Sequence, residues 1–199
     1  IERATNRTLA ISCPLEGEMT KSQKVVDLVT RISQIFRNKE GQLLDFETRP
    51  HWKQIYNEKS RYVVLMTSRQ IGKSTFQATR ILYEMLGTKN ASILLANAKE
   101  AQSKKFRQQS LLPQINRNPK LQRAAFGKTS INNAEMIKLS NGSTLHLEHI
   151  GTSADSARGS SAPTIIVDEV QDIPRENLDV IMESAANFPK DSKYRFTGT

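Results

Sequence analysis

The fold of this chain is most constrained by a polar, glycine-containing loop that lies between an apolar run and a helical pattern. The apolar run Tyr62–Met66 is typical of a buried strand. The loop and the start of the helix read Ser68-Arg69-Gln70-Ile71-Gly72-Lys73-Ser74-Thr75. Such a loop directs backbone N–H groups at phosphate oxygens, and the helix adds the positive end of its dipole. We therefore expect a nucleoside triphosphate site, in which Lys73 contacts the β- and γ-phosphates and the Ser74 hydroxyl binds Mg²⁺.

One position departs from the usual pattern of such loops. In the pattern GxxxxGK[ST] the first glycine stands six residues before the lysine, and this chain has Thr67 there. The remaining Gly-Lys-Ser-Thr also occurs by chance. The loop by itself therefore leaves nucleotide binding and coincidence as alternatives.

A second motif favours nucleotide binding. Residues 164–169 read Thr-Ile-Ile-Val-Asp-Glu, a β-branched run of the kind found in buried parallel strands, ending in two carboxylates. We expect Asp168 to hold Mg²⁺ through water and Glu169 to polarise the attacking water for hydrolysis. An ordinary core strand with an acidic turn would explain either carboxylate singly, but it poorly explains both beside the loop. An activating glutamate also argues against phosphoryl transfer to a small molecule, for which an activated water would be wasteful.

The composition indicates a nucleic-acid partner. The chain has 29 Lys and Arg against 20 Asp and Glu, a net charge of +9 and a pI near 9.8. Its 199 residues suit one α/β domain. The single cysteine, Cys13, excludes an internal disulfide and fits a reducing compartment. No apolar run approaches the ~20 residues of a membrane span, and no secretory pattern is present, so we expect no membrane partner. Because the sequence begins with Ile1 and stops just after a motif, we expect it to be part of a longer protein.

The positive charge is concentrated in one stretch, residues 99–128. Its cations are Lys99, Lys104, Lys105, Arg107, Arg117, Lys120, Arg123 and Lys128, against the single acid Glu100. A phosphate backbone attracts such a segment without regard to base sequence. We interpret it as a polyanion contact, and the alternative is the solvated face of a helical insertion. Phe106 and Phe126 are expected to be packing residues, because too few aromatics are interleaved for a base-stacking channel.

Strand and helix patterns alternate along the chain. We expect helices over residues 21–37, 73–86, 99–110 and 175–186, with Gly41 ending the first and Pro113 the third. We expect strands at Tyr62–Met66, 92–96, 164–169 and 193–196, a linker over 45–51, and a hairpin of 135–139 with 144–150 about Asn141-Gly142. This alternation predicts a mostly parallel sheet with helices on both faces.

The sequence His146-Leu147-Glu148-His149 suggests a metal site, but the spacing argues against one. On a strand His146 and Glu148 share one face, whereas His149 points to the other. A zinc site would also need further ligands, and Cys13 is distant in sequence. We therefore do not interpret these histidines as metal ligands.

As a set, these motifs resemble the ATPase motor of the large terminase subunit, which packages DNA in tailed bacteriophages. The resemblance rests on SRQIGKST, on TIIVDEVQD at 164–172 and on the closing Thr197-Gly198-Thr199, with SADSARG at 153–159 and NAKEA at 97–101 in support. It covers residues 45–199 and leaves 1–44 as an N-terminal extension of unknown role. It implies a P-loop NTPase of the additional-strand, catalytic-glutamate type, with ATP and Mg²⁺ as cofactors.

The resemblance also assigns roles to particular positions. Thr197-Gly198-Thr199 would be the coupling motif, on a strand between the P-loop strand and the acid strand. Trp52 and Gln54 fall where such ATPases place an adenine-contacting segment, although Trp52 could equally be a core residue. Transition-state charge calls for an arginine. Our hypothesis is that Arg158 acts across a subunit boundary and that Arg69 positions phosphates within its own site. The alternative for Arg158 is a surface salt bridge.

The function implied is Mg²⁺-dependent ATP hydrolysis that drives double-stranded viral DNA into a procapsid. The resemblance also implies a homo-oligomeric ring on a portal, a small terminase subunit as partner and a location in the host cytoplasm. A helicase or other DNA translocase of the same ATPase superclass is the first alternative. A non-hydrolysing nucleotide-sensing or DNA-binding module is the second. The sequence has no acidic cluster that we would assign to a nuclease domain.

Overall fold

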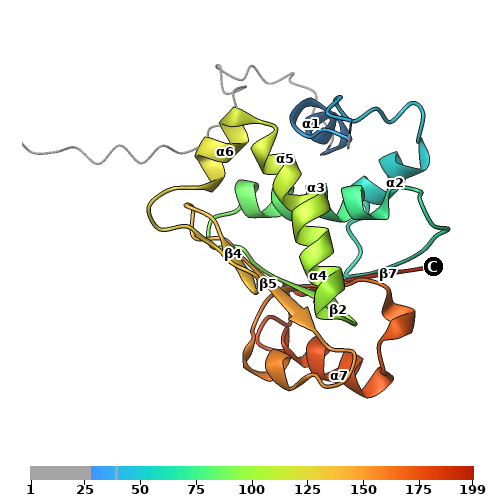
Figure 1. The fold of residues 1–199 in the computed structure, drawn as a ribbon. Helices are drawn as coiled ribbons and strands as arrows, with labels where there is room; N and C mark the ends of the chain where they lie inside the picture. The colour runs from blue at the N-terminus through green and yellow to red at the C-terminus, as the bar shows by residue number, and fades with distance from the viewer. Residues whose placement is uncertain (1–27, 39) are drawn as a thin grey trace, which may run out of the picture.

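A computed structural model describes residues 28–38 and 40–199 and shows one seven-stranded sheet with helices packed against it (Figure 1). The strands are β1 (Tyr62–Met66), β2 (Ser92–Asn97), β3 (Ile131–Asn132), β4 (Met136–Lys138), β5 (Thr144–His149), β6 (Thr164–Val167) and β7 (Lys193–Gly198). Their order in the sheet is β1-β7-β6-β2-β5-β4-β3. The first five strands of this order are mutually parallel, β4 pairs antiparallel with β5, and β3 pairs antiparallel with β4. The predicted mostly parallel sheet is confirmed.

Two layers of core lie on opposite faces of this sheet. Along β2, Ile93 and Leu95 pack on one face, whereas Leu94 and Ala96 pack on the other. Helices α1 to α6 cover the first face and α7 covers the second (Figure 1). Burial on both faces explains why β2 and β6 are nearly continuous apolar runs rather than alternating ones. The prediction of helices on both faces is also confirmed.

The described helices include the four that the sequence predicts and three short ones that it does not. They are α1 (Leu28–Ile35), α2 (His51–Asn57), α3 (Lys73–Gly87), α4 (Glu100–Phe106), α5 (Leu112–Asn116), α6 (Pro119–Ala125) and α7 (Arg175–Glu183), with short 3₁₀ turns η2 (Asp155–Gly159) and η3 (Val170–Asp172). The start of the helix predicted over 21–37 lies outside the described residues, as does Cys13. The predicted linker over 45–51 is irregular until α2 begins at its last residue. None of the described helices is long and apolar enough to cross a bilayer.

The prediction that Pro113 ends a helix is wrong. The chain continues from α4 through a wider π-helical turn, η1 (Arg107–Leu111), into α5, where Pro113 lies in the first turn. In the widened turn the Leu112 N–H donates to the Arg107 carbonyl, five residues back. Pro113 has no N–H to donate, and the first turn of a helix does not require one.

The predicted hairpin is confirmed by the antiparallel pairing of β4 with β5. Gly142 has a φ of 87°, and the Asn141 side chain accepts the Ser143 N–H at 3.0 Å. A left-handed residue next to an asparagine is the usual chemistry of so short a connection.

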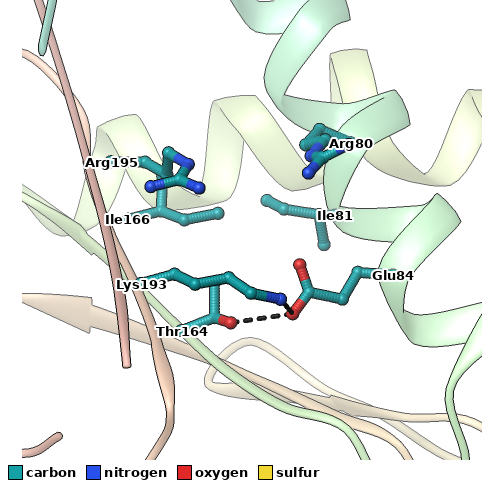
Figure 2. Close-up of a pocket in the computed structure, with 7 residues that line it drawn as sticks. All are labelled: Arg80, Ile81, Glu84, Thr164, Ile166, Lys193 and Arg195. Atoms are coloured by element: carbon teal, nitrogen blue, oxygen red, sulfur yellow. Dashed lines mark hydrogen bonds and ion pairs between the residues drawn. The ribbon is translucent and has the colours of Figure 1, made fainter. Parts of the chain in front are cut away.

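Helix α3, which follows the glycine-containing loop, is anchored to the sheet at the amino ends of β6 and β7. Figure 2 shows the side chains of Thr164 and Lys193 reaching the same oxygen of the Glu84 carboxylate. Glu84 Oε1 accepts the Thr164 hydroxyl at 2.8 Å and lies 3.4 Å from Lys193 Nζ. This contact fixes the C-terminal part of α3 to the sheet, and the first turn of the helix lies at the opposite end, where β1 ends.

Candidate active site

The loop between β1 and α3 has the backbone geometry of a phosphate cradle. Gln70 and Gly72 both have positive φ values, 63° and 101°. The φ of Gly72 is one that glycine adopts readily and other residues adopt only with strain, and a Cβ here would also displace the end of the Arg49 side chain, whose Nη1 would lie 2.8 Å away. The turn then leads directly into α3 at Lys73, which places the N-terminal end of a 15-residue helix at the loop.

Trp52 contacts this loop from helix α2. Its indole N–H donates to the Ile71 carbonyl at 3.1 Å, and its ring stacks on Phe76 with centroids 4.8 Å apart. Arg49 Nη1 donates to the same carbonyl at 3.4 Å. Trp52 is 4% exposed, and the interpretation of it as a core residue is confirmed. Adenine contact by Trp52 or by the exposed Gln54 stays a prediction, and neither residue lines the pocket described below.

Lys73 and Glu169 meet across the site. Lys73 Nζ lies 3.2 Å from Glu169 Oε1 and donates to the Gly198 carbonyl at 3.0 Å. Partial burial raises the pKa of the Glu169 carboxyl, but hydrogen bonds from Gln171 and Lys73 and the nearby ammonium charge outweigh it. The net pKa is lowered, so Glu169 is a carboxylate at neutral pH.

Strand β7 lies between β1 and β6, as the resemblance implied for the strand of Thr197-Gly198-Thr199. Thr197 is buried and donates its hydroxyl to Asp168 Oδ1 at 2.5 Å, and Gln77 Nε2 donates to Thr197 at 2.8 Å. Thr199 donates to Glu169 Oε2 at 3.2 Å. The strand and the residue after it therefore contact both carboxylates of the acid motif, although a role in coupling stays a prediction.

The oxygen atoms at the site suit Mg²⁺. Ser74 is exposed in the first turn of α3 and lines the pocket, and Asp168 follows β6. The Thr197 hydroxyl and the Glu169 N–H both bond to Oδ1 of Asp168. Among the described interactions this leaves Oδ2 for a metal-bound water. A hydroxyl and a carboxylate with the remaining positions open to water and phosphate form the kind of set that Mg²⁺ prefers.

A pocket of about 530 Å³ opens over the loop. One wall contains Arg69, Gln70, Gly72, Lys73, Ser74, Thr75, Glu169 and Thr199, and the other contains Asn38, Glu40, Gln42, Leu43, Leu44, Asp45, Thr48 and Arg49. The sequence does not predict the second wall, and residues 45–49 of it belong to the predicted linker. Buried Gln114 fixes this wall to α5, because its side chain donates to the Arg37 carbonyl at 2.6 Å and accepts the Arg37 N–H at 3.0 Å. The only sequence feature that could have indicated this wall is the high proportion of polar side chains over residues 38–49.

The two candidate arginines lie in different places. Arg69 is exposed and lines the pocket. Arg158 lies in η2, where its Nε is 3.1 Å from Asp155 Oδ1, with side chains 66% and 80% exposed. The surface salt bridge is therefore present, and Arg158 does not line the pocket of its own chain. Action on a neighbouring subunit stays a prediction.

The cations of the basic segment lie on α4, η1 and α6 and in the turns that adjoin α4, α5 and α6. Most are exposed, but Arg107 donates to the Asn132 side chain, Arg117 donates to the Asn38 carbonyl and Lys104 pairs with Glu100. Phe106 is buried in the core and Phe126 packs against it, which confirms both as packing residues.

A phosphate-binding loop before α3, an acid pair after β6 and a strand inserted between them define a P-loop NTPase of the additional-strand, catalytic-glutamate type. A family model described as "Terminase large subunit, T4likevirus-type, N-terminal" matches residues 64–189, more than half of the sequence. The chain belongs to this family of large terminase subunits. No curated protein sequence matches the chain.

Solved structures show the same fold. The large terminase of bacteriophage HK97 superposes with a TM-score of 0.69 at 18% identity, over 84% of this chain and 36% of that one. The large terminase ATPase domain of Thermus phage P74-26 gives 0.57 at 15% identity, over 73% and 62%. A large terminase from a thermophilic bacteriophage gives 0.52 at 14% identity, over 70% and 34%. The chain thus spans less than two thirds of each of these relatives.

Proposed function

We propose that this chain hydrolyses ATP with Mg²⁺ and that the hydrolysis powers packaging of double-stranded viral DNA into a procapsid. The observation that carries the proposal is the convergence of Lys73, Glu169 and the end of β7 in one pocket. A carboxylate beside a phosphate-binding lysine suits activation of a water. Because the residue that follows β7 contacts the same carboxylate, a change at Glu169 during hydrolysis could move β7 and, through it, the rest of a motor. Family membership supports the packaging role.

In the proposed reaction, Lys73 and the loop N–H groups bind the β- and γ-phosphates. Glu169 accepts a hydrogen bond from a water in line with the γ-phosphorus and takes up its proton as the water oxygen attacks. The bond from the γ-phosphorus to the bridging oxygen breaks, and its electron pair leaves with ADP. Ser74 and Asp168 would hold Mg²⁺, which when bound neutralises charge on the phosphates.

Turnover of ATP against protein concentration, with and without long duplex DNA, tests the proposal. We expect phosphate release to rise faster than linearly with protein and to increase with DNA, because a ring-forming motor completes its sites on assembly. Release that is linear and indifferent to DNA would contradict the motor. Strand separation would favour a helicase instead. Tight ATP binding without turnover, even on DNA, would favour a non-hydrolysing module.

The DNA contact belongs to the same proposal. Lys99, Lys105, Lys120, Arg123 and Lys128 are exposed, and no described carboxylate lies within ion-pair distance of them. Unpaired surface cations on consecutive helices attract a phosphate backbone. We further propose that the chain acts as part of a homo-oligomeric ring seated on a portal. Its partner would be the small terminase subunit, and its location the host cytoplasm.

Mixing two inactive variants tests whether Arg158 acts in trans. Arg158→Ala subunits keep Glu169, and Glu169→Gln subunits keep Arg158, so mixed rings would contain complete sites. We expect the mixture to regain a substantial part of wild-type turnover, because an arginine finger is worth about 10³–10⁵ in rate. Arg175→Ala, a change at an exposed arginine on α7, should be active by itself. A mixture as inactive as its components would show that Arg158 does not act across a boundary.

A further inference from the structure

The Gln171 side chain joins the acid motif to the end of β7. Gln171 lies in η3, directly after the acid pair. Its Nε2 donates to Glu169 Oε2 at 2.8 Å and to Thr199 Oγ1 at 3.1 Å. Its Oε1 accepts the Thr199 N–H at 3.4 Å. One amide group thus connects the side chain of the proposed water-activating residue with both the backbone and the side chain of Thr199.

The local backbone is arranged so that this connection can form. Glu169 has φ 49° and ψ 54°, a left-handed conformation that is costly for a non-glycine residue and persists only when the surroundings hold it. A Cβ at Gly198 would lie 2.7 Å from Gln171 Oε1 and 2.9 Å from Met66 Sδ. The close approach of β7 to Gln171 therefore depends on glycine at position 198.

The two oxygens of Glu169 have different partners. Oε1 is paired with Lys73, whereas Oε2 is held by Gln171 and Thr199. When ATP enters, its phosphates compete for Lys73, and the contact at Oε1 is the one that must be exchanged. Gln171 does not line the pocket, so its bond to Oε2 can persist while nucleotide is bound.

We propose that Gln171 is a positioning residue, which holds the Glu169 carboxylate for the attacking water and ties its place to that of Thr199. The assignment rests on the proposed ATPase function. It makes the link between hydrolysis and β7 reciprocal, because a displacement of Thr199 would draw Glu169 out of line.

The test is Gln171→Met in the full chain, with Gln122→Met as the matched control at an exposed glutamine on α6. Methionine keeps the length and bulk of glutamine but has no N–H to donate. We expect kcat to fall about 10- to 100-fold, since small misplacements of reacting groups cost this much. KM for ATP should stay within about twofold, because Gln171 does not line the pocket. Wild-type kcat in Gln171→Met, or a loss confined to KM, would overturn the assignment.

A double-mutant cycle with Thr199 separates positioning from packing. If Gln171 and Thr199 hold Glu169 together, Thr199→Ala combined with Gln171→Met should lose little more than the worse single variant. Thr199→Ser keeps the hydroxyl and should retain most of the activity. Losses that multiply in the double variant would contradict a shared role.

The outcome also distinguishes this assignment from the function on which it rests. A wild-type chain without turnover under all assembly conditions would remove both. A wild type that is active and sensitive to Glu169→Gln but indifferent to Gln171→Met would remove only the role of Gln171.

Discussion

Glutamine in place of Glu169 is expected to lower ATP turnover about a thousandfold while ATP affinity stays near that of the wild type. The change removes the carboxylate that accepts the proton of the attacking water, and general bases contribute about 10²–10⁴ in rate. It preserves the side-chain length and leaves the phosphate-binding loop untouched. Phosphate release under single-turnover conditions measures the rate. The fluorescence of Trp52 measures binding, because this single tryptophan donates a hydrogen bond to the loop carbonyl of Ile71.

The control for this variant is Glu176→Gln, the same chemical change at an exposed position in the first turn of α7. It should turn over ATP like the wild type. Substantial turnover by Glu169→Gln would mean that another group activates the water, and our assignment of the acid pair would then be wrong.

Alanine in place of Lys73 is expected to abolish turnover and to weaken ATP binding about a hundredfold or more. The ammonium group is the charge that the loop offers to the β- and γ-phosphates, and loss of one such preorganised donor typically costs about 10²–10³ in rate. Arginine should not rescue the variant. The Lys73 side chain is only 10% exposed, and its compact ammonium bridges Glu169 Oε1 and the Gly198 carbonyl, a geometry that a planar guanidinium does not reproduce.

Titration of ATP against Trp52 fluorescence, followed by phosphate release, measures both effects. Lys89→Ala, which removes an exposed lysine just beyond α3, serves as the matched control. If Lys73→Ala bound ATP with wild-type affinity, the loop would not be the phosphate site.

The sheet and the two motif loops could be predicted because their signals are local. The apolar runs of β2 and β6 predict buried strands, and the periodic apolar residues of α3 predict a helix, without reference to any other part of the chain. The position of β7 beside β1 was implied only by the resemblance, because nothing in residues 193–198 specifies a neighbour so far back in the chain.

The parts that were missed depend on long-range contacts or on short signals. The second wall of the pocket is built from residues over 38–49 and held by Gln114, which is 77 positions after its partner Arg37, so no local pattern reveals it. Helix α6 did have a signal. The Asn118 side chain accepts the N–H groups of Lys120 and Leu121, and Pro119 occupies the first turn, so an asparagine followed by a proline marks the start of this helix.

The place of β7 in the sheet has a mechanical consequence. The strand pairs with β1 over Tyr194–Gly198 on one side and with β6 over Lys193–Phe196 on the other, both in parallel register. A pull on Thr199 along the strand would therefore load two ladders in shear, with many bonds sharing the force, instead of peeling them apart in turn. Strand β1 has only β7 as a neighbour among the described strands and would resist less. The strand that contacts Asp168, and whose following residue contacts Glu169, is thus held along both edges where force would leave the pocket.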